Sequence, residues 1–344
     1  MKQILFDLPV SAEGSPFIDL PEHTGLEPYI YLRDRLRERG YDIHTPHGRS
    51  VRDAERVLFW DVRFSPRAGR LREMARSARQ TWRRIRGRDG VRSVYRETLR
   101  AGLEDQMALF LGEPPVVHPP NWDRGAHATF PIVFTWNDDW VDGKRYHKFR
   151  YPITGHTPPL PDPKFSERKL LVNFSGNKIS PHPNELYSAR RRAIRFFERN
   201  HAEQFALYGP GWDRPVDGEG PYITWRGQVA HKWDVYPTYR FGLCYENMCD
   251  EPGWVTEKIF DCLRAGSVPI YWGASNVEQD VDPATFIDRS RLGSDGELAR
   301  LLLDMSEAEW LRCRRAGRDY LASKKFAAFL PPAFADTIIR ALQL

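Results

Sequence analysis

Short apolar runs that alternate with amphipathic segments constrain the fold of this 344-residue chain more than any other feature. Runs such as residues 2–8 and 169–174 have the length and composition of buried strands. Residues 28–39 instead begin with proline, carry apolar side chains at helical spacing and end at Gly40, as a helix does. Strands that alternate with helices favour an α/β fold with parallel sheets.

The same pattern gives a full set of expected elements. Strands are expected at residues 2–8, 41–44, 57–60, 107–111, 132–135, 169–174, 205–208, 241–245 and 268–271. Helices are expected at residues 28–39, 185–199, 256–265, 297–305 and 307–321. Ser306 and Glu309 have the spacing of a capping box at the start of the last helix.

A proline-rich stretch separates two halves of the chain. Five prolines fall between Tyr151 and Pro163, which indicates an interdomain linker. We therefore expect an N-terminal domain at 1–160, a C-terminal domain at 161–325, and a helix in 326–344 that packs back on the first domain. Two Rossmann-like halves that face each other leave a cleft, the usual place for a nucleotide-sugar site.

Positive charge is concentrated in one insertion, residues 64–100. This segment holds twelve arginines and three acidic residues, whereas the whole chain carries a net charge of only +5. A helical arginine-rich segment can contact anionic lipid headgroups or a charged lipid-linked glycan, or it can simply be a solvated face. Nucleic-acid binding is disfavoured because the charge is not spread over a fold.

The sequence contains no apolar run of the length that crosses a bilayer, and Asp7 interrupts the first apolar run. The four cysteines show neither CxxC spacing nor a disulfide framework. We therefore expect a cytoplasmic protein, with peripheral contact to the inner face of the cytoplasmic membrane as a further hypothesis.

The most informative segment is 240–274. It reads as a buried strand that ends in Glu246 and Asn247, a glycine-containing loop, a helix capped by Thr256, and a further strand. Polar groups at the carboxyl end of a parallel strand, followed by a helix start, form a ligand crevice. Lys258 in the first helical turn opposes the helix dipole at a cost of roughly 0.3–1 kcal/mol. A diphosphate bound at this helix start would make the lysine favourable instead. The alternatives are that Lys258 extends into solvent or pairs with Glu257.

Residues 241–274 resemble the donor-binding signature of the family 10 α-1,3/4-fucosyltransferases, through Phe-Gly-Leu-Cys-Tyr-Glu-Asn, Gly-Trp-Val-Thr-Glu-Lys and Val-Pro-Ile-Tyr-Trp-Gly. The resemblance implies a GT-B type fold and a GDP-fucose donor. It places Lys258 on the donor diphosphate and surrounds the sugar and nucleotide with Glu246, Asn247, Trp254, Thr256 and Glu257. The sequence departs from the pattern in a longer loop before Gly253 and in Trp254, where many members have tyrosine.

A second match lies upstream, at residues 172–177 and 184–197. These residues resemble the strand, loop and helix whose arginine grips the donor diphosphate, a task that suits the forked, permanently charged guanidinium. The register selects Arg190 and leaves Arg191 and Arg192 as alternatives. The resemblance also includes Tyr208, which caps the guanine or fills the core, and a loop from Trp225 to Lys232.

The resemblance places the catalytic base in the first half. Gly112-Glu113-Pro-Pro resembles the strand-end Gly-Glu of the family, whose carboxylate takes the proton of the acceptor hydroxyl. Trp136, Asn137, Tyr146 and His147 are expected on the acceptor side.

The implied reaction is inverting transfer of L-fucose from GDP-fucose to a hydroxyl of an acceptor glycan, GlcNAc or glucose, in α-1,3 or α-1,4 linkage, within protein glycosylation or polysaccharide biosynthesis. Asp280-Val-Asp282 spells a metal-binding DxD but precedes Pro283 in a loop the family does not use, so no metal site is expected. No cofactor is required, and a divalent metal is at most stimulatory. The alternatives are another nucleotide-sugar donor or a non-enzymatic glycan- or nucleic-acid-binding protein.

Overall fold

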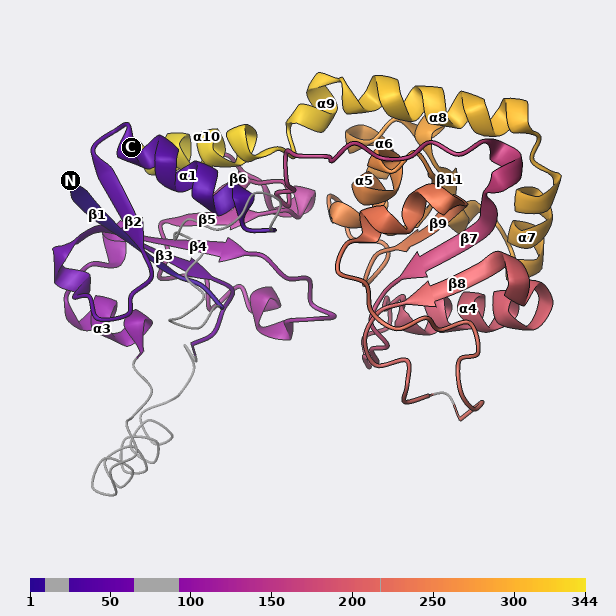
Figure 1. Cartoon of the computed structure of the whole chain (residues 1–344). Coiled ribbons are helices and arrows are strands. Elements are labelled where there is room, and N and C mark those ends of the chain that lie inside the picture. The colour runs from indigo at the N-terminus through magenta and orange to yellow at the C-terminus, as the bar shows by residue number, and fades with distance from the viewer. Residues whose placement is uncertain (10–24, 65–92, 217) are drawn as a thin grey trace. The chain divides into compact units, whose positions relative to one another are not determined.

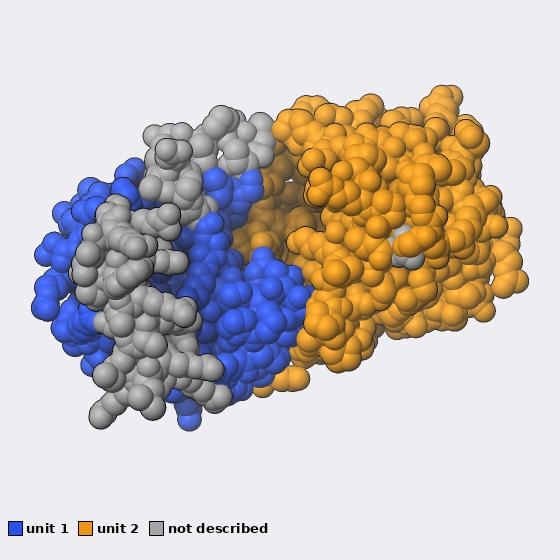
Figure 2. Space-filling view, turned by 90° about the horizontal axis from the view of Figure 1, so that it is seen from below, with its two compact units in different colours: residues 1–136, 140–149, 335–344 blue, residues 137–139, 150–334 orange. Residues whose placement is uncertain are grey.

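The computed structural model describes residues 1–9, 25–64, 93–216 and 218–344, which divide into two compact units (Figure 2). Unit 1 comprises Met1–Trp136, Trp140–Phe149 and Ala335–Leu344. Unit 2 comprises Asn137–Asp139 and Arg150–Phe334. The chain therefore returns to its first unit with its last ten residues.

Unit 1 is built on one parallel sheet with the strand order β2-β1-β3-β4-β5-β6 (Figure 1). Its strands are β1 (Lys2–Asp7), β2 (Tyr41–His44), β3 (Ala54–Trp60), β4 (Met107–Leu111), β5 (Ile132–Thr135) and β6 (Tyr146–Lys148). Its helices are α1 (Glu27–Arg37), α3 (Val94–Arg100) and, from Ala335 onward, α10 (Pro331–Leu342). The carboxyl ends of all these strands lie at one edge, because every pairing is parallel.

Alternate side chains of the unit 1 strands fill two cores. Phe59, Leu109 and Val133 pack with Tyr95 of α3 on one face. On the other face Trp60 stacks on Phe110 with ring centroids 5.8 Å apart and an interplanar angle of 12°. This strict alternation holds the register of the sheet, because a shift by one residue would exchange the faces.

Gly112, which directly follows β4, lies against the Trp60 indole, and a Cβ at this position would overlap that ring. Since the ring is itself stacked on Phe110, it has little room to move. We expect Gly112→Ala to lower the free energy of unfolding by about 2 kcal/mol, measured by urea denaturation. Gly25→Ala, at a position with open space around it, is the control and should change stability by less than about 0.5 kcal/mol. Equal stability of the two variants would contradict this packing argument.

Unit 2 contains a second parallel sheet with the order β11-β10-β9-β7-β8. Its strands are β7 (Lys169–Phe174), β8 (Phe205–Tyr208), β9 (Tyr239–Tyr245), β10 (Val268–Trp272) and β11 (Ile287–Asp288). Its helices are α4 (Tyr187–His201), α5 (Glu257–Arg264), α6 (Val277–Asp280), α7 (Asp295–Asp304), α8 (Glu307–Leu321) and α9 (Lys324–Ala327).

Helices cover both faces of the unit 2 sheet, with α4 below and α8 above it in the view of Figure 1. Leu171 and its neighbours pack with α4 and α7, whereas Val172 and its neighbours pack with α5, α8 and α9. The sheet is therefore buried on both sides, which explains why its central strands are almost entirely apolar.

The structure confirms the expected strands and helices and the Ser306–Glu309 capping box. The short elements β6, β11 and α9 were not expected from the sequence. Within the arginine-rich segment 64–100, residues 94–100 form α3, but residues 65–92 lie outside the described residues, so the membrane-contact hypothesis stays a prediction. Among the described residues, no helix has both the length and the apolar character needed to cross a bilayer.

Candidate functional site

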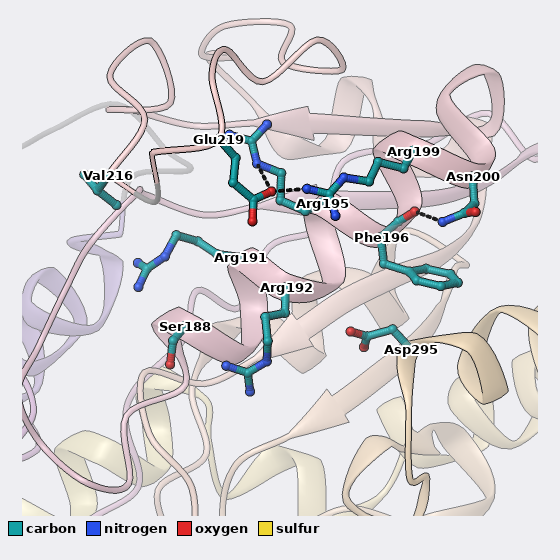
Figure 3. A pocket seen from close by; sticks show the side chains of 10 residues that line it. All are labelled: Ser188, Arg191, Arg192, Arg195, Phe196, Arg199, Asn200, Val216, Glu219 and Asp295. Atoms are coloured by element: carbon teal, nitrogen blue, oxygen red, sulfur yellow. Dashed lines mark hydrogen bonds and ion pairs between the residues drawn. The ribbon is translucent and has the colours of Figure 1, made fainter.

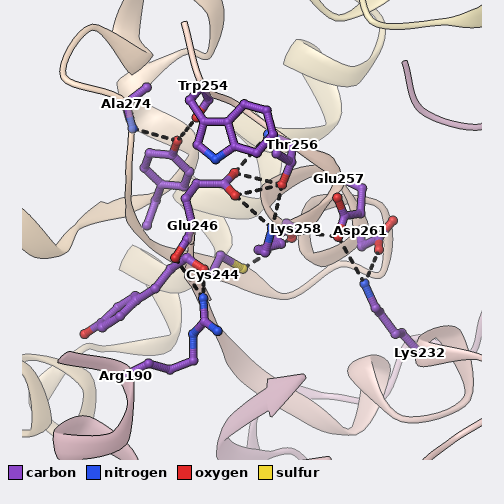
Figure 4. A network of polar contacts seen from close by, with 12 residues as sticks. Arg190, Lys232, Cys244, Glu246, Trp254, Thr256, Glu257, Lys258, Asp261 and Ala274 are labelled. Atoms are coloured by element: carbon purple, nitrogen blue, oxygen red, sulfur yellow. Dashed lines mark hydrogen bonds and ion pairs between the residues drawn. The ribbon is translucent and has the colours of Figure 1, made fainter. Parts of the chain in front are cut away.

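Glu246 is the centre of a polar network in unit 2 (Figure 4). It follows β9, and its side chain is fully buried. The carboxylate accepts hydrogen bonds from the Thr256 backbone N–H at 2.9 Å, from the Thr256 hydroxyl at 2.8 Å and from Lys258 Nζ at 2.8 Å. These donors offset the large cost of placing a carboxylate away from water.

Thr256 occupies the N-cap position of α5, as predicted, but its side chain forms no cap hydrogen bond with the helix. Its hydroxyl donates to Glu246 and accepts a hydrogen bond of 2.8 Å from Lys258 Nζ. The buried carboxylate is a charged acceptor and forms the stronger bond. The first N–H groups of α5 consequently donate no hydrogen bond to this side chain.

Lys258 lies at the amino end of α5 with its side chain 19% exposed. Its nearest carboxylate is Glu246, at 2.8 Å, rather than the adjacent Glu257, at 3.9 Å. Burial opposes the ammonium charge, but Glu246 and Glu257 outweigh it and raise the pKa of Lys258. Lys258 is therefore a charged group held in place at neutral pH, which excludes the alternative of a lysine that simply extends into solvent.

Of the three consecutive arginines in α4, Arg190 alone is buried, while Arg191 is partly buried and Arg192 is exposed. Arg190 Nη2 donates to the carbonyls of Tyr245 at 2.6 Å and Glu246 at 2.8 Å. Burial lowers the pKa of Arg190. The structure thus brings Arg190 to the carboxyl end of β9, beside Glu246, as the sequence register selects. Its contact with a phosphate stays a prediction.

Lys232 joins the same network, although the sequence marked it only as the end of a loop. Its Nζ lies 2.9 Å from Asp261 and 3.8 Å from Glu257. Glu246, Lys258, Glu257, Lys232 and Asp261 thereby form a row of alternating charges around the start of α5 (Figure 4). The spacing of Glu257 and Asp261 by four residues places them on one helix face, and this was the available sequence signal.

The other predicted donor-side residues surround this network less closely. Trp254 is buried and meets Tyr151 edge to face, with ring centroids 5.8 Å apart. Tyr208 is partly buried and stacks on Phe174 at 5.3 Å. The carbonyl of Asn247 accepts a bond of 3.0 Å from the Leu186 N–H. Their roles in binding a nucleotide sugar remain predictions.

Glu113 is partly buried in unit 1, in the turn that follows β4. Asp61 organises this turn by accepting bonds from the N–H groups of Gly112 at 2.8 Å and Glu113 at 3.1 Å. Asn121 donates to Asp61 at 2.7 Å and to the Glu113 carbonyl at 2.8 Å. Asp61 adopts the left-handed backbone conformation, with φ of 62°, which asparagine and aspartate tolerate best. Sequence reasoning missed both supporting residues.

The four predicted acceptor-side residues have different hydrogen-bond partners. Trp136 and Tyr146 are buried in unit 1, and the Tyr146 hydroxyl lies 3.1 Å from His127 Nδ1. His147 Nε2 lies 3.1 Å from the Lys144 carbonyl. Asn137 counts with unit 2 and donates to Glu251 at 3.0 Å. Their role toward an acceptor stays a prediction.

The two acids of the DxD sequence both have structural partners. Asp280 accepts bonds of 2.8 and 2.9 Å from Arg150, and Asp282 accepts a bond of 2.9 Å from the Ala284 N–H at the start of a helical turn. The described residues contain no group of three or more His, Cys, Asp or Glu side chains arranged to hold a metal ion.

Residues 213–315 match the glycosyltransferase family 10 (fucosyltransferase) C-terminal domain. This range includes Glu246, Thr256 and Lys258, the residues of the buried network. The chain carries a family 10 glycosyltransferase domain. Arg190 and Glu113 lie outside the matched range.

Two curated relatives are similar to part of the chain. The chain is 44% identical over 186 residues to an α-(1,4)-fucosyltransferase of Arabidopsis thaliana, covering 51% of this chain and 43% of that protein. It is 39% identical over 75 residues to the α-(1,3)-fucosyltransferase FucT of Helicobacter pylori, covering 22% of this chain and 16% of that protein. The chain therefore spans less than half of the length of these relatives.

Solved structures extend the similarity to the whole fold. The crystal structure of an α1,3-fucosyltransferase aligns with a TM-score of 0.55 at 15% identity, over 99% of this chain and 90% of that chain. A structure described as that enzyme with GDP-fucose aligns over the same shares, at 15% identity and a TM-score of 0.52. With its two parallel sheets, the chain has the GT-B fold.

Glu257 makes the family 10 domain sensitive to acid. Burial alone would raise its pKa, but Lys258 and Lys232 lower the pKa of Glu257 from 4.5 to about 2. Because the pKa of Glu257 is lower in the folded state, its ionised carboxylate stabilises the protein fully above about pH 4.5. This stabilisation is lost as the pH falls toward 2. We expect the stability difference between the parent and Glu257→Gln to shrink from pH 6 to pH 3, measured by urea denaturation. A pH-independent difference would contradict this assignment.

Proposed function

We propose that the chain transfers L-fucose from GDP-fucose to a hydroxyl of an acceptor glycan, with inversion at the fucose C1. The observation that carries the proposal is the charged Lys258 held at the amino end of α5 inside the family 10 domain. Two relatives, an α-(1,4)- and an α-(1,3)-fucosyltransferase, support fucose as the sugar. The GDP-fucose complex of a protein with the same fold supports the donor.

The donor part of the proposal rests on charge. When the bond between C1 and the phosphate oxygen breaks, GDP gains negative charge, which cations and helix N–H groups stabilise. Lys258 and N–H groups of the first turn of α5 supply these groups, and the Thr256 side chain accepts no hydrogen bond from that turn. Arg190, beside Glu246, adds a second positive charge. We propose that these groups neutralise the leaving GDP and that no divalent metal is required.

The acceptor part of the proposal assigns Glu113 as general base. The Glu113 carboxylate takes the proton of the acceptor hydroxyl while that oxygen forms a bond to C1 and the bond from C1 to GDP breaks. A β-linked donor then gives an α-fucoside. We propose GlcNAc or glucose as the accepting sugar, in α-1,3 or α-1,4 linkage. The hydrogen bonds of Asp61 and Asn121 support this role, since they fix the backbone from which the carboxylate extends.

Radiolabelled donor transfer over a glycan array tests the function directly. GDP-fucose should give labelled glycan, whereas GDP-mannose and UDP-glucose should give none above background. A parallel reaction in EDTA should proceed at a similar rate. Transfer from a different nucleotide sugar but not from GDP-fucose would favour the alternative donor, and loss of transfer in EDTA would overturn the metal-independent chemistry.

A further inference from the structure

Helix α4 presents two different faces to its surroundings. Its inner face contributes Ala193, Ile194 and Phe197 to the core of unit 2. Its outer face carries Arg191, Arg192, Arg195 and Arg199. From Arg191 to Arg199, eight steps of the helix, this row extends about 12 Å along its axis. Arginines three and four residues apart repel each other, so the row is unfavourable unless an anion is near it.

The arginine row lines a pocket of about 470 Å³ (Figure 3). This volume is within the range typical of ligand sites. Val216 and Glu219 line it from one loop, Asp295 from the start of α7, and Phe196 and Asn200 from α4 itself. Val216 is 49% exposed, so its apolar surface is open to a ligand. We call this pocket the α4 groove.

Two of the four arginines are already neutralised. Glu219 lies between Arg195 and Arg199 in Figure 3 and forms ion pairs with both. Arg195 also pairs with Glu198 at 3.0 Å and lies over the Tyr222 ring at 3.5 Å. Asp295, the other acid of the groove, pairs with Arg289 at 3.0 Å.

The remaining two arginines leave positive charge in the groove. Arg191 donates to the backbone carbonyl of Lys178, which carries no net charge. Arg192 is exposed and forms no ion pair with any residue that the structure describes. The α4 groove therefore combines two uncompensated guanidinium groups with the apolar surfaces of Phe196 and Val216 and the amide of Asn200.

We propose that the α4 groove binds an acidic sugar chain. Guanidinium groups bind carboxylate or sulfate groups with two parallel hydrogen bonds, the Asn200 amide suits hydroxyl groups, and the Phe196 ring and Val216 suit the apolar faces of sugar rings. The inference deepens the proposed function and rests on it, since it gives the acceptor glycan negatively charged units. The groove is separate from the donor network, because Arg190 points to the opposite face of α4 from Arg192.

Other polyanions fit the α4 groove less well. A flat bilayer surface cannot enter a pocket, whereas a single sugar chain can enter the one that these arginines line. Single-stranded nucleic acid binds chiefly by stacking its bases on several aromatic side chains, and Phe196 is the single aromatic residue among those that line the groove.

Calorimetric titration with an oligogalacturonate tests the proposal independently of any transfer reaction. The parent protein should bind it, and binding should weaken with added salt, whereas a neutral galactan oligosaccharide of equal length should not bind. Arg191→Gln/Arg192→Gln should weaken binding about a hundredfold, at about tenfold for each charged contact. Arg192→Gln alone, at an exposed position, should weaken it about tenfold without affecting folding. Arg315→Gln/Arg318→Gln, two exposed arginines of α8, is the matched control and should bind like the parent.

Several outcomes would overturn the proposal. These are no binding by the parent, equal binding of the neutral chain, or equal binding by the Arg191/Arg192 variants. Competition by GDP, or loss of GDP affinity in the double variant, would instead assign these arginines to the donor site. Stronger binding to phosphatidylglycerol vesicles or to a DNA oligonucleotide would assign the groove to another class of partner. If the protein bound oligogalacturonate but transferred fucose to no glycan, the α4 groove would still be a binding site for acidic sugar chains, and the proposed function would be wrong.

Discussion

Glu113→Gln is expected to lower the rate of fucosyl transfer by about 10²–10⁴-fold while GDP affinity stays within about twofold. The amide has the size of the carboxylate but cannot accept the proton of the acceptor hydroxyl. The turn should survive, because Asp61 and Asn121 bind the backbone N–H and carbonyl of Glu113 rather than its side chain. Single-turnover transfer and calorimetric GDP titration measure the two quantities separately.

Asp105→Asn provides a matched control, since it also replaces an acid of unit 1 by its amide, at an exposed position just before β4. Its transfer rate should stay within about twofold of the parent rate. Glu113→Asp should retain part of the activity, because a carboxylate is present but withdrawn by one methylene. A Glu113→Gln protein that is folded and fully active would place the base elsewhere in the chain.

The sequence was most informative where burial is complete. The central strands of both sheets are covered on two sides, so their apolar runs indicated the strands almost to the residue, as for residues 107–111 and 169–174. Strands β6 and β11, of three and two residues, contain too few side chains for any periodicity to show.

Side-chain partners from distant parts of the chain were the main source of error. Thr256 has the local signature of a helix cap, yet its hydroxyl bonds Glu246, ten residues earlier in the chain. Lys258 was weighed against its neighbour Glu257, but its closest carboxylate is again Glu246. Asp61 supports the turn of Glu113 across two adjacent strands. Such contacts depend on the tertiary fold, and no local spacing encodes them.

For the three arginines 190–192, helical geometry alone predicted only that their side chains point in different directions. Successive residues of a helix point about 100° apart, so the three side chains could not all face the same site. The family resemblance selected Arg190, and the structure places this residue inside and Arg192 outside. The sequence could not show that the outer arginines line a pocket, because Val216, Glu219 and Asp295 come from other segments.

Lys258→Met is expected to weaken GDP binding by more than tenfold, the loss of one charge-assisted contact, and to lower the free energy of unfolding by about 3 kcal/mol. The second effect arises because the fully buried Glu246 carboxylate loses its cationic partner at 2.8 Å. Calorimetric titration with GDP and urea denaturation measure the two effects independently.

The double variant Glu246→Gln/Lys258→Met separates binding from stability. It removes both charges of the buried pair, so much of the lost stability should return, since neutral replacements of buried ion pairs are often tolerated. GDP affinity should stay low, because the cation that meets the diphosphate is still missing. If the double variant regained GDP affinity together with stability, Lys258 would act only as the counterion of Glu246. If Lys258→Met bound GDP as tightly as the parent, the diphosphate would not bind at the amino end of α5, and the donor half of the proposed function would be wrong.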